Sequence, residues 1–300
     1  MDRFRSIQVL IAVAEEGGFA PAAKRLGMSP PAVTRAVAAL EDHLDVRLFS
    51  RTTRVVRLTE TGARFLADGR RILEGLAEAE ASATGAHSEL RGEVGVTAPS
   101  MFGRLFVAPI AIDFLARHPE VSVRTLLVDR VVDLVEEGFD IAVRIAHLPD
   151  SSLMAIQVGS MRHVVCAAPS YLAEHGVPKE PADLLRMEAI DFSFSIPQRQ
   201  WAFPTAGGRT RIVRPPARFF ANSAEVAVAA AVAGRGIVRL LAYQVEQEVR
   251  AGKLEIVLAN YEPPPIPVHV VHVEGRRAAA RVRAFVDLAV ERLRAETWLS

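Results

Sequence analysis

The strongest constraint on this chain is a pair of short amphipathic segments near its N-terminus, separated by one glycine. Apolar residues recur at three- and four-residue spacing on both sides of that glycine, which predicts helices Phe19–Leu26 and Pro30–Leu44. Two helices that cross at so short a turn need a small residue on the first, a turn residue free of Cβ strain and an apolar residue on the second. Ala23, Gly27 and Val33 supply these features. The segment is therefore predicted to be a helix-turn-helix.

The start of the second predicted helix carries residues that suit contact with DNA. Ser29 is placed to cap this helix, and Pro30 occupies its first position, where a missing N–H costs nothing. An arginine there can bond guanine in the major groove, and a threonine can contact a thymine methyl. The candidate base-contacting residues are Ser29, Pro31, Thr34 and Arg35. Helical hairpins with glycine turns also occur in enzymes, and there Arg35 would be only a solvated surface charge.

A basic stretch follows, although the net charge of the whole chain is only +1. Residues 46–59 contain no acid and four arginines, Arg47, Arg51, Arg54 and Arg57. Within this stretch Val55–Leu58 is typical of a short strand, which could pair with the segment near Arg47 as a small wing. The cluster is a candidate phosphate-binding surface. The alternative is ordinary surface solubility.

The next segment predicts one long helix, because it is rich in Ala, Glu, Leu and Arg and lacks proline from Thr59, a plausible N-cap, to about Leu90. Its small and apolar residues form a heptad-like stripe of Phe65, Ile72, Ala79 and Ala86 with Gly69, Leu76, Ala83 and Leu90. Such a stripe predicts a coiled-coil seam. We expect a homodimer through this helix and a homotetramer built from such dimers. Alternatively, the stripe docks the helix on its own chain.

From Gly92 onward, segments typical of strands alternate with segments typical of helices. The predicted strands are Val94–Thr97, Val121–Val128, Asp140–Ile145, Arg162–Cys166 and Val268–Val273. The predicted helices are Met101–Arg117, Val131–Glu137, Ala224–Ala233 and Arg276–Glu296. This alternation predicts a mostly parallel sheet with helices packed on it. Because the last helix can return to the first half, we expect two lobes joined by two crossovers.

Taken together, residues 18–41, 48–62 and 129–144 resemble the LysR-type transcriptional regulators, and the resemblance covers nearly the whole chain. It implies a sequence-specific transcription regulator that binds double-stranded promoter DNA. The DNA-binding residues that it implies are Ser29, Pro30, Pro31, Thr34 and Arg35 from the helix, and Arg51, Thr52 and Arg54 from the wing. Many members carry a glutamine where this chain has Pro30.

The resemblance also implies that a small effector, expected to be a small organic acid, binds between two lobes similar to those of bacterial solute-binding proteins. The candidate effector-binding residues are Ser100, Met101, Arg144, Phe194, Asn222 and Ser223. Facing helix N-termini at Ser100 and Asn222 could hold a carboxylate. Each of these polar residues could instead be only a helix cap, Arg144 could pair with Asp140, and Phe194 and Trp201 could be core residues.

The expected fold class is therefore α+α/β, with an N-terminal winged helix-turn-helix, a long dimerisation linker helix and a two-lobed α/β effector-binding domain. We expect the DNA-binding domain at residues 1–60, the linker helix at 61–90 and the effector-binding domain at 91–300. Within the last part, lobe I is expected at about 91–161 and 268–300, and lobe II at about 162–267.

Other classes of protein fit the sequence less well. The common nucleotide-binding, serine-hydrolase and zinc-protease motifs are absent, so we expect no catalytic residue and no cofactor. His269 and His272 are three apart on a predicted strand and point to opposite faces, so no metal site is expected. A free-standing solute-binding protein is the nearest rival, but its export would require a signal that the N-terminus lacks.

The compartment follows from similar observations. The lone Cys166 cannot form an intramolecular disulfide, and it is expected to be a buried strand residue. The sequence has no apolar run of the roughly eighteen residues that a membrane helix needs. We therefore expect a cytoplasmic protein with no membrane partner.

Overall fold

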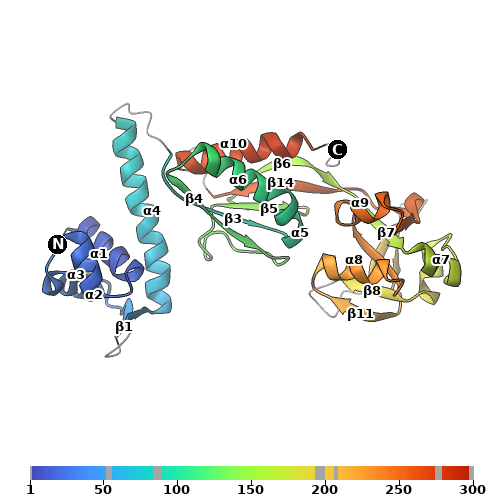
Figure 1. Ribbon diagram of the computed structural model, residues 1–300, viewed down its shortest axis with the longest axis horizontal. Helices are drawn as coiled ribbons and strands as arrows, with labels where there is room; N and C mark the ends of the chain where they lie inside the picture. Colours follow the sequence, from blue (N-terminus) through green and yellow to red (C-terminus); the bar gives the residue numbers. More distant parts are fainter. Residues whose placement is uncertain are drawn as a thin grey trace. The chain divides into compact units, whose positions relative to one another are not determined.

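The computed structural model describes residues 2–51, 56–83, 90–192, 200–205, 209–273 and 279–296 of the 300-residue chain (Figure 1). The chain folds into two compact units, Met1–Gly92 and Glu93–Ser300. Within the described residues, no helix combines the length and the apolar character that crossing a membrane would require.

The first unit is built on three helices, α1 (Arg3–Glu15), α2 (Phe19–Leu26) and α3 (Pro30–Leu44). The predicted bounds of α2 and α3 are confirmed. Gly27 ends α2 with a φ of +63°, a conformation that favours glycine. Ala23 and Val33 are buried in the core of this unit, as the crossing of the two helices requires. The helix-turn-helix is thus confirmed together with the local features that predicted it.

A two-stranded wing follows α3. Strands β1 (Phe49–Arg51) and β2 (Val56–Leu58) pair antiparallel. The wing is fixed to α3 by the buried carboxylate of Glu41, whose Oε1 accepts hydrogen bonds from the backbone N–H groups of Leu48 (2.8 Å) and Phe49 (3.0 Å). Because these donors lie at the start of β1, Glu41 sets where the wing leaves the helix.

The long helix α4 (Glu60–Ala83) begins as expected at Thr59, whose Oγ1 accepts a hydrogen bond from the Gly62 N–H at 2.9 Å. The sequence predicted that this helix continues to about Leu90. Leu90 is not helical, and the structure describes the helix only as far as Ala83, since residues 84–89 lie outside the described part. Leu90 itself is thus outside the helix, and the predicted bound at about Leu90 otherwise falls on residues outside the described part.

The stripe along α4 has two environments. Its first part docks on the same chain: Phe65 packs against the core of the first unit, and the buried Gly69 lies against Ile7 of α1. Farther along, Ile72 and Leu76 are exposed by 48% and 37%. The other positions of the stripe that were assigned from the sequence, the side chains of Ala79, Ala83 and Ala86, lie outside the described residues. The docking alternative thus holds for the first turns of the helix.

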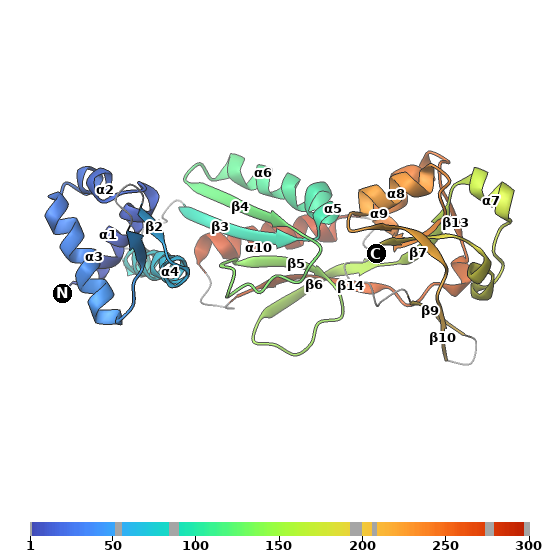
Figure 2. The ribbon, with the colours of Figure 1, turned by 90° about the horizontal axis from the view of Figure 1, so that it is seen from below.

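The second unit contains two five-stranded sheets, one in each lobe (Figure 2). In lobe I the strand order is β4-β3-β5-β14-β6. The strands are β3 (Gly92–Ala98), β4 (Val121–Leu127), β5 (Ile141–Ile145), β6 (Met154–Met161) and β14 (Ile266–His272). The helices of this lobe are α5 (Ser100–Phe102), a π-helical turn (Gly103–Val107), α6 (Ala108–Arg117) and α10 (Ala280–Arg294).

In lobe II the strand order is β11-β8-β12-β7-β13. The strands are β7 (His163–Ala167), β8 (Ala189–Phe192), β11 (Ala217–Ala221), β12 (Ile237–Leu241) and β13 (Glu255–Val257), with a separate hairpin of β9 (Trp201–Pro204) and β10 (Thr210–Val213). The helical segments are α7 (Pro169–His175), α8 (Ala224–Val232), α9 (Ala242–Arg250) and the 3-10 turns Pro181–Arg186 and Ala259–Tyr261. Cys166 is fully buried, and burial raises its pKa to about 12, as expected for a structural thiol.

Both sheets are mixed, so the prediction of a mostly parallel sheet is wrong. Strands β3 and β5 pair parallel, as do β8 with β11 and with β12. The segments that connect the lobes account for the antiparallel pairs. Strand β14, which returns the chain from lobe II, is antiparallel to both β5 and β6, and β7, which enters lobe II, is antiparallel to β12 and β13.

The predicted helix at 131–137 is also wrong, because this segment forms turns. Asp133 accepts hydrogen bonds through Oδ1 from the N–H groups of Val135 (2.9 Å) and Glu136 (3.0 Å), so its side chain provides a local alternative to helical bonding. Glu137 is held outside a helix by its pair with Arg130, at 2.6 Å. The segment lies between β4 and β5, beside the carboxyl ends of strands in lobe I.

Candidate functional site

The exposed start of α3 presents the residues predicted to contact bases. Ser29 occupies the N-cap position, but its side chain makes no capping hydrogen bond, so that part of the prediction is wrong. Of the two N–H groups that such a cap bonds, one is missing because Pro31 has none, and the other, on Ala32, bonds the Ser29 carbonyl oxygen at 2.9 Å. The Ser29 hydroxyl therefore stays free of the helix backbone.

The remaining α3 candidates differ in exposure. Pro30, Pro31 and Arg35 are exposed, whereas Thr34 is half-buried and its hydroxyl donates to the Pro30 carbonyl oxygen at 3.1 Å. Arg35 has no ion-pair or hydrogen-bond partner within the described ranges. Arg25 on α2, by contrast, pairs with Glu15 at 2.7 Å. The guanidinium of Arg35 is therefore available to an external anion or base.

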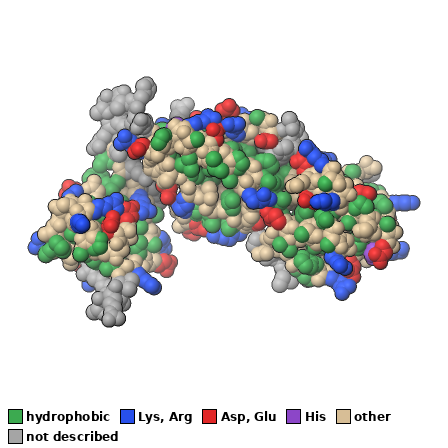
Figure 3. Space-filling model, viewed as in Figure 1, with side chains coloured by type: hydrophobic (Ala, Val, Ile, Leu, Met, Phe, Trp, Pro, Cys, Tyr) green, Lys and Arg blue, Asp and Glu red, His purple; other side chains and the backbone are tan. Residues whose placement is uncertain are grey.

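The wing arginines have mixed outcomes. Arg47 pairs at 3.1 Å with Glu41, an acid that precedes the basic stretch, so this arginine is already partly neutralised within the chain. Arg57 is exposed. The side chain of Arg51 and the whole of Thr52 and Arg54 lie outside the described residues, so three predicted DNA contacts cannot be placed. On the face of the first unit seen in Figure 3, basic and acidic side chains lie beside each other.

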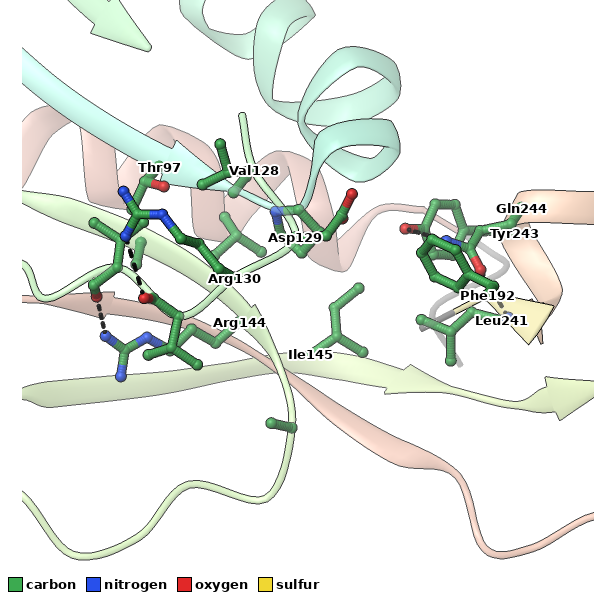
Figure 4. Close-up of a pocket in the computed structure, with 17 residues that line it drawn as sticks. Thr97, Val128, Asp129, Arg130, Arg144, Ile145, Phe192, Leu241, Tyr243 and Gln244 are labelled. Atoms are coloured by element: carbon green, nitrogen blue, oxygen red, sulfur yellow. Dashed lines mark hydrogen bonds between the residues drawn. The ribbon is translucent and has the colours of Figure 1, made fainter. Parts of the chain in front are cut away.

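A cavity of about 330 Å³ lies between the two lobes of the second unit (Figure 4). Its volume falls in the range of small-molecule sites. The lobe I side consists of the ends of β3 and β5 and the loop after β4, which contribute Thr97, Val128, Asp129, Arg130, Arg144 and Ile145. The lobe II side consists of Phe192, Leu241, Tyr243 and Gln244. Most of this wall is apolar, with a few polar groups.

Among the predicted effector-binding residues that the structure describes, only Arg144 lines this cavity. Its Nη2 donates to the Val132 carbonyl oxygen at 3.0 Å. The alternative pair with Asp140 is not formed, and no carboxylate among the described residues pairs with Arg144. Asp140 instead accepts a hydrogen bond from the Gly95 N–H at 2.7 Å. The backbone carbonyl orients the guanidinium without neutralising its charge.

Four other predicted effector residues, Ser100, Met101, Asn222 and Ser223, do not line the cavity. Ser100 donates its N–H to Asp129 Oδ1 at 3.0 Å, so this helix N-terminus already holds a carboxylate of the chain itself. Met101 packs against the core of lobe II. Ser223 caps α8 by accepting from the Val226 N–H at 3.4 Å, and Asn222 is exposed. The expected arrangement of two facing helix N-termini around one ligand is therefore absent from this cavity.

Phe194 and Trp201 are the two aromatic residues that the sequence analysis considered near this site. Phe194 lies outside the described residues. Trp201 is 9% exposed and belongs to the core of lobe II, as the alternative proposed.

Asp129, Tyr243 and Gln244 line the cavity although the sequence did not indicate them. Tyr243 is buried, and burial together with the negative charge of Asp129 raises the pKa of its hydroxyl above the usual range. Gln244 accepts from the Leu241 N–H at 2.9 Å and donates to the Tyr243 oxygen at 3.4 Å. Asp129 alone had a usable signal, since it follows a strand where α/β proteins commonly bind ligands.

Comparisons with known proteins agree with both units. Residues 4–63 match the family model of bacterial regulatory helix-turn-helix proteins, lysR family, and residues 87–294 match the LysR substrate binding domain. The HTH-type transcriptional regulator CrgA of Neisseria meningitidis serogroup B is 33% identical over 288 residues, which cover 96% of each chain. The HTH-type transcriptional activator AaeR of Escherichia coli K12 is 31% identical over 287 residues, covering 96% of this chain and 93% of that protein.

The solved structure of CrgA is similar to the whole chain, with a TM-score of 0.62, 32% identity and coverage of 96% of this chain and 98% of that one. A winged helix-turn-helix joined to a two-lobed binding domain defines a DNA-binding regulator that carries a ligand-binding unit. The chain belongs to the LysR-type transcriptional regulators.

Proposed function

We propose that this regulator binds specific promoter DNA through α3 and the wing, and that a small organic acid in the cavity between the lobes changes its activity. The unpaired guanidinium of Arg144 in the cavity wall is the observation that carries the choice of an acid. A cation in a partly apolar site is stabilised by a bound carboxylate, and an arginine can form two hydrogen bonds with it. The ligand acts by binding one arrangement of the lobes better than another.

The proposed division of the chain assigns DNA binding to residues 1–60, oligomerisation to the linker helix at 61–90 and effector binding to 91–300. On the DNA side, the free Ser29 hydroxyl and the unpaired Arg35 guanidinium support base contacts from α3. The proposed DNA-contacting residues are Ser29, Pro30, Pro31, Thr34, Arg35, Arg51, Thr52 and Arg54. The wing arginines would bind mainly phosphate, which contributes affinity more than sequence choice.

Replacing Arg35 by alanine tests the proposed DNA surface. We expect the affinity for the chain's own promoter fragment to fall by about 1–3 kcal/mol, because a bidentate contact with guanine is lost. Affinity for a scrambled duplex at the same salt concentration should change much less. Fluorescence anisotropy with both duplexes measures the difference.

The control for this test is Arg235→Ala, which removes an exposed arginine from the second unit and should leave both affinities unchanged. An equal loss on both duplexes would assign Arg35 to the phosphate backbone. No loss on either would place DNA on another surface.

The exposed part of α4 supports a homodimer through this helix, and a homotetramer built from such dimers. Ile72 and Leu76 are large apolar side chains on a helix whose preceding turns already dock on the same chain. We expect the double variant Ile72→Glu, Leu76→Glu to sediment as a smaller species than the wild type, because two carboxylates would be buried in the seam. Sedimentation velocity over a range of concentrations measures this shift.

Arg64→Glu is the control for the charge change, since Arg64 is 66% exposed on the same helix. It should leave the sedimentation coefficient unchanged. An unchanged mass of the double variant would exclude this part of α4 as the dimer contact.

A further inference from the structure

The cavity between the lobes holds two charges of opposite sign that the described part of the chain leaves unneutralised. Arg144 and Asp129 both line it. Both belong to the lobe I wall, and Figure 4 shows the Arg144 guanidinium and the Asp129 carboxylate apart from each other along it, with Arg130 between them in this view. This arrangement constrains the effector more closely than the presence of one cation does.

The positive charge in this cavity belongs to Arg144. The neighbouring Arg130 also lines the cavity, but Glu137 neutralises it through two hydrogen bonds of 2.7 and 2.6 Å. Within the described residues, Arg144 bonds only the neutral carbonyl group of Val132. A single ligand carboxylate therefore balances the charge of Arg144.

The negative charge belongs to Asp129, which uses one carboxylate oxygen to accept a hydrogen bond from the Ser100 N–H. No Lys, Arg or His within the described residues forms an ion pair with it. Its carboxylate lies on the side of Tyr243 (Figure 4), whose raised pKa keeps the phenol protonated and uncharged at neutral pH. The second oxygen of Asp129 can thus accept a hydrogen bond from a ligand.

Much of the remaining lining is apolar and includes Val128, Ile145 and Leu241. A plain monoacid would neutralise Arg144 and leave Asp129 facing a hydrocarbon end, which removes water from a charge without replacing its hydrogen bonds. A diacid would place a second carboxylate near Asp129, where like charges repel. A ligand that carries a carboxylate at one end and a hydrogen-bond donor at the other would satisfy both Arg144 and Asp129.

We propose that the effector is a carboxylic acid with a hydrogen-bond donor at its far end: the carboxylate binds Arg144, an apolar chain crosses the cavity, and an ammonium or hydroxyl group donates to Asp129. This inference rests on the proposed function, because it assumes that the cavity is the effector site. It adds the chemical class of the ligand and assigns Asp129 as the residue that selects it.

The test is isothermal titration calorimetry of the full-length protein with four series of matched chain length, from butanoic to octanoic acid. The series are the plain acids, the ω-hydroxy acids, the ω-amino acids and the α,ω-diacids. At the best length we expect an ω-amino or ω-hydroxy acid to bind about tenfold or more tightly than the plain acid, as a charge-assisted hydrogen bond allows. The diacid should bind more weakly than the plain acid. The comparison of the amino and hydroxy series identifies the donor.

Two variants separate the inference from the proposed function. Asp129→Asn keeps an oxygen that can accept the Ser100 N–H but removes the charge, so the advantage of the substituted acids should fall below about threefold and the diacid should improve. Arg144→Gln should weaken every series about tenfold or more, because each depends on the carboxylate contact. Arg235→Ala serves as the control and should bind every series as the wild type does.

The outcomes are distinguishable. If the wild type binds plain and substituted acids equally, or if Asp129→Asn keeps the wild-type preference, a ligand with a donor at its far end is excluded while the acid site stands. If Arg144→Gln binds all acids as the wild type does, the acid site in this cavity is wrong, and so is the inference built on it. Failure of all four series to bind the wild type would overturn both.

Discussion

Replacing Gly62 by alanine is expected to destabilise the first unit by about 1–3 kcal/mol and to weaken promoter binding strongly. A Cβ atom at this position would overlap the carbonyl oxygen of Leu48 and lie 2.8 Å from its carbonyl carbon. That carbonyl group is backbone and cannot rotate away, because its oxygen accepts the Thr59 N–H at 2.9 Å while the Leu48 N–H is held by Glu41. The start of α4 or the start of the wing must therefore shift. Differential scanning calorimetry and a gel-shift titration with the promoter fragment measure the two effects.

Gly75→Ala is the matched control because it makes the same substitution on the same helix. A Cβ atom at Gly75 meets nothing within 4 Å. The higher helix propensity of alanine should stabilise α4 by up to about 1 kcal/mol, with no loss of DNA binding. Equal behaviour of the two variants would mean that the close approach of Gly62 to the wing has no energetic consequence.

Local signals were enough to predict the helix-turn-helix. The turn glycine, the small residue at Ala23 and the apolar spacing lie within one short segment, and each acts on neighbours along the chain. The start of α4 at Thr59 was predicted for the same reason, since an N-cap bonds a residue three positions later. The cap at Ser29 failed because a second proline at Pro31 removes one of the donors that such a cap needs.

The sequence could not predict features that depend on contacts between distant segments. Heptad spacing on α4 is the same whether the stripe faces α1 or a second copy, and only the structure shows that its first turns face α1. Mixed sheets arose because β7 and β14 lie at the two passages between the lobes, a consequence of topology that alternation of strands and helices does not reveal.

The candidate effector site was predicted only in part, for a related reason. Arg144 was found because a charged residue near the end of a strand stands out in an apolar run. Tyr243 and Gln244 follow it by about one hundred residues in an ordinary amphipathic helix, so nothing local linked them to Arg144. The helix start at Ser100 was expected to bind a ligand anion, but the chain supplies its own carboxylate there, from Asp129.

Replacing Glu41 by alanine is expected to destabilise the first unit by about 2–5 kcal/mol. The Glu41 side chain is only 1% exposed and accepts two backbone N–H groups, from Leu48 and Phe49, which would be left buried without partners. Glu41→Gln keeps an oxygen that can accept these bonds and loses only the charge, so its cost should be clearly smaller. Hydrogen–deuterium exchange of the full-length protein should show faster exchange in α3 and β1, because it reports local stability.

Asp42→Ala is the control, since Asp42 is the neighbouring acid on α3 and is exposed. It should change the stability by no more than about 0.5 kcal/mol. Because Glu41 fixes the origin of the wing, the alanine variant should also lose promoter affinity, whereas the glutamine variant should keep most of it. If Glu41→Ala and Asp42→Ala exchange at the same rate and bind promoter DNA equally well, the buried carboxylate does not hold the wing in place.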